Sequence, residues 1–168
     1  KPQSFHFANV PRSGGLATII SFIIFVILND LLFSIKYFDY LIVGTGLFLI
    51  GFLEDIKFKI SPKMRLIIMT IFMFIAIRLF SIEIYNIDFN FLNYILTFDI
   101  FLNLFILFCF LFIINGANLI DGFNGLLALQ LIIINSILLY INIHNDFQMV
   151  SILITSQIII LLIFLLFN

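Results

Sequence analysis

Long apolar runs separated by short polar stretches dominate the pattern along this chain. A bilayer core about 30 Å thick requires roughly 20 apolar residues as a helix, because lipid offers no partner to unpaired backbone groups. Six segments of the chain come near this length. The second, residues 38–53, is short and carries Gly44, Gly46 and Gly51, which favour close helix packing over nucleotide binding. We therefore predict an all-α, polytopic integral membrane protein with about six transmembrane helices. The predicted spans are 15–35, 38–53, 65–82, 100–118, 125–143 and 147–167.

Composition supports the same fold class. The chain is 64% hydrophobic and only 10% charged, with a mean hydropathy of +1.29, whereas a soluble domain is about one quarter charged. Its net charge of −1 gives no reason to expect a nucleic-acid partner. The single cysteine, Cys109, excludes a disulfide within the chain. Both termini fall inside patterned sequence, so we expect residues 1–168 to form one membrane-embedded domain that is incomplete at both ends.

The lysines and arginines predict the orientation in the membrane. Lys1 and Arg12 precede the first predicted span, and four basic residues separate the second from the third. The opposite loops hold few basic residues, so the basic side is predicted to be cytoplasmic. Three unusual stretches share that side, and the cytoplasmic loops predicted within them are residues 1–15, 54–65 and 115–125.

The first stretch contains "HFANVPRSGGLA", residues 6–17. Pro11 restricts the backbone, and two glycines allow a tight turn into a helix. Arg12 is a candidate phosphate ligand, with help from the amides at the start of the helix. The alternative is a simple turn with an ordinary cytoplasmic arginine.

The second stretch is "GFLEDIKFKISPKMRL", residues 51–66, in which two acids end an apolar helix. Glu54 and Asp55 suit proton abstraction or a divalent metal, and the basic residues that follow, including Lys63, suit phosphates. A solvated interfacial loop would explain the lysines. It would not explain paired acids at the end of the helix.

The third stretch is "NGANLIDGFNGLLA", residues 115–128. Asn115, Asn118 and Asp121 are spaced three apart, so a continuing helix would bring them roughly onto one face. Amides can bind a base or sugar, and Asn118 and Asp121 can supply oxygens to a metal. The alternative is a capped or re-entrant turn with glycine as terminator. The remaining polar residues of the spans, Asn135 and Gln157 among them, are predicted to form helix-packing hydrogen bonds or to be interfacial groups.

Together the three stretches resemble the polyprenyl-phosphate N-acetylhexosamine-1-phosphate transferases. That family has a "H-x4-PRxGGLA"-like, a "GFxDD-x4-LSP-x2-KL"-like and an "NxxNxxDGxDGLA"-like motif. This chain matches them in order and spacing with His6 and "PRSGGLA", with "GFLED", and with "NGANLIDGFNGLLA". The resemblance implies that the chain is a single transferase domain.

The implied reaction moves a sugar-1-phosphate from a UDP-sugar to undecaprenyl phosphate and releases UMP, with Mg²⁺, or Mn²⁺ in its place. By resemblance Asp55 and Glu54 act on the lipid phosphate, and Asp121 is a third catalytic acid. Asn118 and Asp121 hold the metal, and the resemblance leaves open whether the reaction takes one step or passes through a covalent intermediate. The substrate-binding residues would be Asn118, Asn115, Asn124, His6, Arg12 and Lys63.

The chain departs from the family pattern at three places: Glu54 and Asn124 stand where aspartates are usual, and Gln3-Ser4 stand where a basic pair often precedes the histidine. The "PRSGGLA" form resembles the branch that initiates O-antigen, lipopolysaccharide or teichoic-acid glycans more than the peptidoglycan branch. The implied location is the bacterial cytoplasmic membrane with the motif loops in the cytoplasm, and a homodimer stays open. The alternatives are a transporter or flippase fragment and a non-catalytic degenerate copy, and the fragment alone is expected to be inactive.

Overall fold

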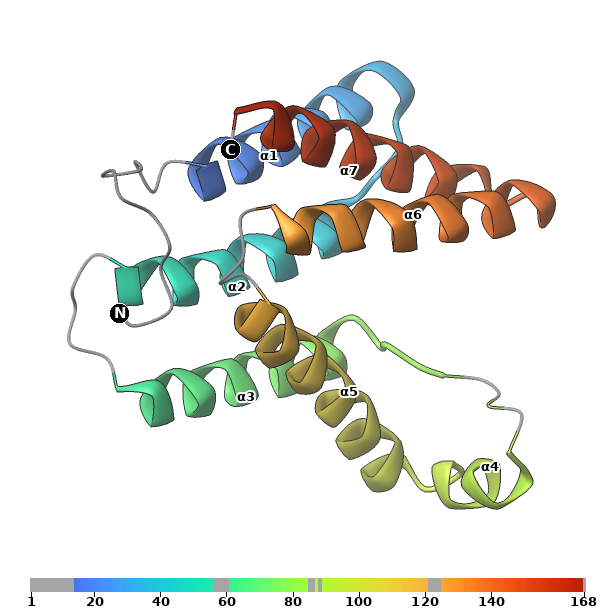
Figure 1. Ribbon diagram of the computed structural model, residues 1–168. Coiled ribbons are helices and arrows are strands. Elements are labelled where there is room, and N and C mark those ends of the chain that lie inside the picture. Colours follow the sequence, from blue (N-terminus) through green and yellow to red (C-terminus); the bar gives the residue numbers. More distant parts are fainter. Residues whose placement is uncertain (1–13, 56–60, 85–86, 88, 121–124, 168) are drawn as a thin grey trace. The chain divides into compact units, whose positions relative to one another are not determined.

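The computed structural model describes residues 14–55, 61–84, 87, 89–120 and 125–167, leaving aside the side chains of Glu54, Asp55, Asn118 and Leu119. The described chain is helical and contains no strand, so the predicted all-α class is confirmed (Figure 1). Its helices are α1 (Gly14–Phe33), α2 (Phe38–Asp55), α3 (Pro62–Leu79), α4 (Asn90–Leu96), α5 (Asp99–Ile120), α6 (Leu126–His144) and α7 (Gln148–Phe167). Six of them lie at the six predicted segments, and α4 was not predicted.

Four stretches of the described helices are long and apolar enough to cross a membrane: Gly14–Phe33, Asp99–Ala117, Leu126–His144 and Gln148–Phe167. Phe38–Leu53 is apolar but shorter. In α3 the apolar stretch between Arg65 and Arg78 falls short of a bilayer core at 1.5 Å per residue. The chain is therefore a multi-pass helical membrane protein, while the count of six spans stays a prediction.

The chain divides into two compact units, which are described separately. Unit 2 comprises residues 42–116 and holds most of α2, all of α3 and α4, and α5 up to Gly116. Its core is formed by Met73 and Ile77 of α3 with Ile106 and Leu107 of α5. Side chains of α2, including Val43, pack against this cluster. The core therefore joins three helices.

Unit 1 comprises residues 1–41 and 117–168. Helices α6 and α7 form a hairpin with α1 beside α7 (Figure 1). A buried cluster of Val26, Tyr37 and Leu153 joins α1 to α7. At the other end of α1, a Cβ added to Gly14 would lie 2.7 Å from the ring of Phe164, so the two helices approach closely at a glycine.

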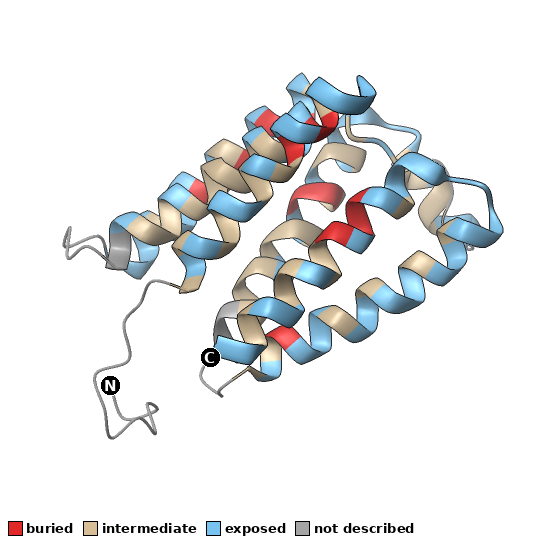
Figure 2. Ribbon diagram, turned by 90° about the horizontal axis from the view of Figure 1, so that it is seen from above, coloured by how far each residue is buried: buried red, intermediate tan, exposed pale blue. Residues whose placement is uncertain are grey.

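Large apolar side chains cover the outside of both units. Leu31, Phe112 and Phe167 are 75%, 78% and 88% exposed, and buried residues are few (Figure 2). Such a surface would be costly in water, because soluble monomers rarely expose large contiguous apolar patches. Surrounded by lipid tails, the same side chains meet a solvent of their own polarity. The exposure pattern thus agrees with the membrane assignment.

Candidate functional site

The paired acids of the second stretch end a helix, as predicted. Helix α2 continues through Glu54 and Asp55 and ends there. Its preceding residues, "LFLIGFL", are apolar, so the helix carries the two acids to the end of its apolar part. Carboxylates at such a boundary need not be buried in lipid, where an unpaired charge is expensive.

The basic half of the same stretch begins α3. Ser61 is the N-cap, and its Oγ accepts a hydrogen bond of 3.3 Å from the backbone N–H of Met64. Pro62 occupies the first helical position, where its missing N–H costs nothing. This cap was not predicted, although a Ser-Pro pair ahead of a helix is its usual signal.

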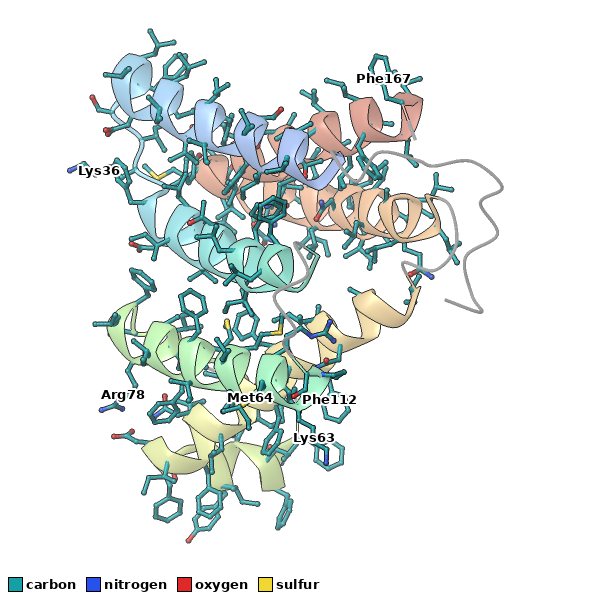
Figure 3. The ribbon with its side chains drawn as sticks, turned by 90° about the vertical axis from the view of Figure 1, so that its left-hand side faces the viewer. Lys36, Lys63, Met64, Arg78, Phe112 and Phe167 are labelled. Carbon is teal, nitrogen blue, oxygen red and sulfur yellow. The ribbon has the colours of Figure 1, made fainter. Side chains whose placement is uncertain are left out.

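The first turn of α3 concentrates positive charge. Lys63 is exposed (Figure 3), and Arg65 lies in the same turn and has an interaction partner. The partial positive charge of a helix N-terminus adds to these two cations. A positive potential of this kind attracts phosphate groups.

The third stretch does not begin as a turn. Helix α5 runs unbroken to Ile120, so Asn115 and Asn118 are one helical turn apart on a continuous helix. The half-buried Asn115 donates its Nδ2 to the carbonyl oxygen of Leu111 at 2.7 Å. That bond uses one of the two N–H donors of the amide nitrogen, and the amide oxygen is the atom suited to accept from a ligand.

Glycine rather than a polar side chain starts the next helix. Gly125 is the N-cap of α6 with φ of 69°, a left-handed conformation, and it makes no side-chain cap. Asn118 lies within α5. Helix capping therefore accounts for Gly125 but not for Asn115 or Asn118, which weakens the capped-turn alternative.

Unit 2 brings part of the candidate site to one end. The C-terminal end of α2, the N-terminal end of α3 and the C-terminal half of α5 point to the same side of this unit (Figures 1 and 3). Glu54, Asp55, Lys63 and Asn115 belong to unit 2, and Asn118 is grouped with unit 1. The structure thus supports a shared location for the first four, at the level of the helices that carry them.

Several candidates lie outside the described residues. These are His6, Arg12, Asp121 and Asn124, together with the side chains of Glu54, Asp55 and Asn118. Within the described part of the chain, no group of three or more His, Cys, Asp and Glu side chains could hold a metal. The predicted roles of these residues stay predictions.

One polar prediction for the spans is confirmed. The Nδ2 of Asn135 in α6 donates to the Oε1 of Gln157 in α7 at 3.4 Å. Both amides lie well inside long apolar helices, where a hydrogen bond between helices satisfies groups that lipid cannot. Their role is to pack the hairpin.

A comparison with known protein families shows which family the chain belongs to. The sequence model of glycosyl transferase family 4 matches residues 37–168, a range that includes both the α2–α3 stretch and the α5–α6 stretch. Curated proteins and solved structures give no match. The match supports a membrane-bound polyprenyl-phosphate sugar-1-phosphate transferase in general terms. The chain belongs to glycosyl transferase family 4.

Proposed function

We propose that the protein transfers an N-acetylhexosamine-1-phosphate from a UDP-sugar to undecaprenyl phosphate and releases UMP. The observation that carries this proposal is the common end of unit 2, where α2 ends in two acids and α3 begins with two cations. Acids and cations together suit a reaction between two phosphates. The family match over the same residues adds independent support.

The chemistry requires one anion to attack another. An oxygen of the lipid phosphate attacks the β-phosphorus of the UDP-sugar and forms a new P–O bond. The bond to the bridging oxygen breaks, and UMP leaves with its electron pair. We assign Asp55 to accept the proton of the lipid phosphate, with Glu54 beside it to orient that group. Lys63 and Arg65 would offset the negative charge of the meeting phosphates.

We assign the nucleotide and metal side of the site to the end of α5. Asn118 and Asp121 are three residues apart in sequence, and both offer the hard oxygen atoms that Mg²⁺ prefers. The donor set therefore fits a Mg²⁺ ion, or Mn²⁺ in its place. Such an ion would neutralise charge on the phosphates when bound. Asn115, Asn124, His6 and Arg12 are proposed to hold the UDP-sugar.

The proposed setting is the bacterial cytoplasmic membrane, with residues 1–15, 54–65 and 115–125 in the cytoplasm. The lysines and arginines of these stretches support that orientation. The "PRSGGLA" form supports initiation of an O-antigen, lipopolysaccharide or teichoic-acid glycan over peptidoglycan synthesis.

The test is the Asp55→Asn variant of the full-length protein, assayed in membranes with undecaprenyl phosphate and labelled UDP-sugars. We expect loss of labelled lipid product, because the amide cannot accept the proton, with unchanged protein level. Asp39→Asn is the matched control, since Asp39 is an acid in the first turn of the same helix. Near-normal turnover of Asp55→Asn would remove Asp55 from the mechanism.

A transporter or flippase is the second candidate. It would place polar residues and broken helices near the middle of the membrane. The amide pair of Asn135 and Gln157 is such a feature, but it is engaged in a hydrogen bond between helices. Transport of a lipid-linked sugar without formation of UMP would favour this candidate.

A further inference from the structure

Helix α4 and the residues beside it present aromatic rings to the outside. Phe91, Tyr94 and Phe98 are 68%, 71% and 55% exposed, and Phe89 is 64% exposed. No residue of α4 is buried. Figure 3 shows rings projecting outward at this end of unit 2.

The opposite side of α4 attaches the helix to its own unit. Leu92, Asn93 and Leu96 are partly buried. The Oδ1 of Asn93 accepts a hydrogen bond of 2.9 Å from the backbone N–H of Ile87. A seven-residue helix is not stable alone in water, so these contacts hold α4 in place and leave its aromatic side outward.

The aromatic side continues onto α5. The rings of Tyr94 and Phe98 meet edge to face with centroids 6.3 Å apart, and Phe98 meets Phe101 in the same way at 6.3 Å. Phe101 is 54% exposed on a stretch long and apolar enough to cross a membrane, which begins at Asp99. The exposed rings of α4 thus adjoin a lipid-facing surface at the very end of a span.

The charge of residues 89–101 indicates which lipids this aromatic side can contact. Residues 89–101 contain no lysine or arginine, and their one ionisable side chain other than Tyr94 is Asp99. An amphipathic helix that binds anionic lipids carries basic residues on its polar side. Tyrosine is enriched at the boundary between headgroups and acyl chains, and phenylalanine occurs on the membrane side of helices that lie in this boundary.

We propose that α4 and the turn after it form a membrane-surface anchor, with Phe91, Tyr94 and Phe98 inserted at the headgroup–acyl boundary of the bilayer that α5 crosses. The anchor holds the start of α5 at a defined depth in the membrane. Its partner is the lipid itself, through apolar contact, and neutral lipids suffice. The proposal concerns unit 2 and does not depend on the transferase reaction.

Residues 1–168 contain no tryptophan, so the signal of one introduced tryptophan is obtained by subtracting the emission of the unsubstituted protein under the same quencher. We would prepare Tyr94→Trp and, separately, Phe91→Trp in the full-length protein. Each is reconstituted in phosphatidylcholine vesicles whose lipids carry bromine either near the headgroup or near the end of the acyl chains. Phe108→Trp is the matched control, because Phe108 is 56% exposed near the middle of the Asp99–Ala117 stretch.

For Tyr94→Trp and Phe91→Trp we expect bromine near the headgroup to quench the tryptophan fluorescence more strongly than bromine near the end of the acyl chains. The emission should also be blue-shifted relative to tryptophan in water. The control should show the reverse depth preference. Quenching by aqueous iodide without quenching by bromine would place α4 in water and overturn the proposal. Protection from both quenchers would also overturn it, because a protein surface would then cover the rings.

Discussion

The hydroxyl of Tyr37 donates a 2.7 Å hydrogen bond to the backbone carbonyl of Met149, a residue 112 positions later in the chain. Tyr37 lies in the connection between α1 and α2 and is only 3% exposed, and Met149 is in the first turn of α7. The ring also stacks on Phe25 of α1 with centroids 5.8 Å apart. One side chain therefore fixes this connection against two helices of unit 1.

The Tyr37→Phe variant should be less stable than the natural protein. It keeps the ring but loses the hydrogen bond, which is worth about 1 kcal/mol. We expect a lower thermal midpoint of unfolding in detergent. The unfolding is monitored as the loss of the helical circular dichroism signal. The control is Tyr40→Phe, which removes a hydroxyl from a side chain that is 53% exposed. Equal effects of the two variants would contradict a special role for the Tyr37 hydrogen bond.

Because of Tyr37, we expect the stability of the folded protein to decrease at alkaline pH. Burial, and secondarily the neighbouring Tyr40, raises the pKa of Tyr37 above the ordinary value of 10.0. The folded state then keeps its proton where the unfolded state loses it, so stability is full below pH 10.0 and falls as pH rises from there through the folded pKa. Unfolding measured across this window should show a smaller decline for Tyr37→Phe. An identical decline in both proteins would refute the assignment.

A substitution at Gly46 should disturb the packing of α2 on α3. A Cβ added there would overlap the ring of Phe72, and overpacking of a well-packed site costs about 1–3 kcal/mol. We expect Gly46→Ala to lower the thermal midpoint and Phe72→Leu in the same chain to restore part of it. Gly51→Ala is the control in the same helix, since a Cβ at Gly51 meets nothing within 4 Å. A midpoint for Gly46→Ala at or above that of the control would show that the ring moves freely.

Substitutions at the end of α5 should act on nucleotide and metal use. For Asn118→Ala and Asp121→Ala we expect a raised Michaelis constant for the UDP-sugar or a raised Mg²⁺ requirement, because each loses an oxygen donor. Transfer is measured over a series of UDP-sugar and Mg²⁺ concentrations. The control is Asn103→Ala at the other end of α5. The side-chain amide of Asn103 donates a 2.7 Å hydrogen bond to the backbone carbonyl of Asp99. Michaelis constants equal to those of the control would count against this site.

The positions of the long helices could be predicted because their signals are local. The span predicted over 147–167 is α7, Gln148–Phe167, and the span predicted over 38–53 is α2, Phe38–Asp55. The helix predicted over 65–82 runs instead over Pro62–Leu79, because Ser61 and Pro62 start it before its basic residues. Helix α4 was missed because its seven residues are too few to display a period.

For the candidate site too, part of the arrangement could be predicted from sequence spacing and part was decided only by the structure. Spacing alone placed Asn115 and Asn118 on one helical face, if the helix continued. The structure decided that it does continue to Ile120 and that the cap of the next helix is Gly125. It also placed Lys63 in the first turn of a capped helix. Sequence spacing cannot decide where a helix ends when asparagine and glycine fit either a helix end or a loop.

The sequence by itself therefore determined the fold class and the places of the long helices, and it singled out the three stretches that are proposed to carry chemistry, since each depends on neighbouring residues. Which side of each helix faces protein was decided only by tertiary structure. Phe110 packs against the core of unit 2, whereas Phe112 is 78% exposed. The physical reason is that these helices are apolar all round, so lipid and protein interior offer a phenylalanine nearly the same environment and only shape separates them.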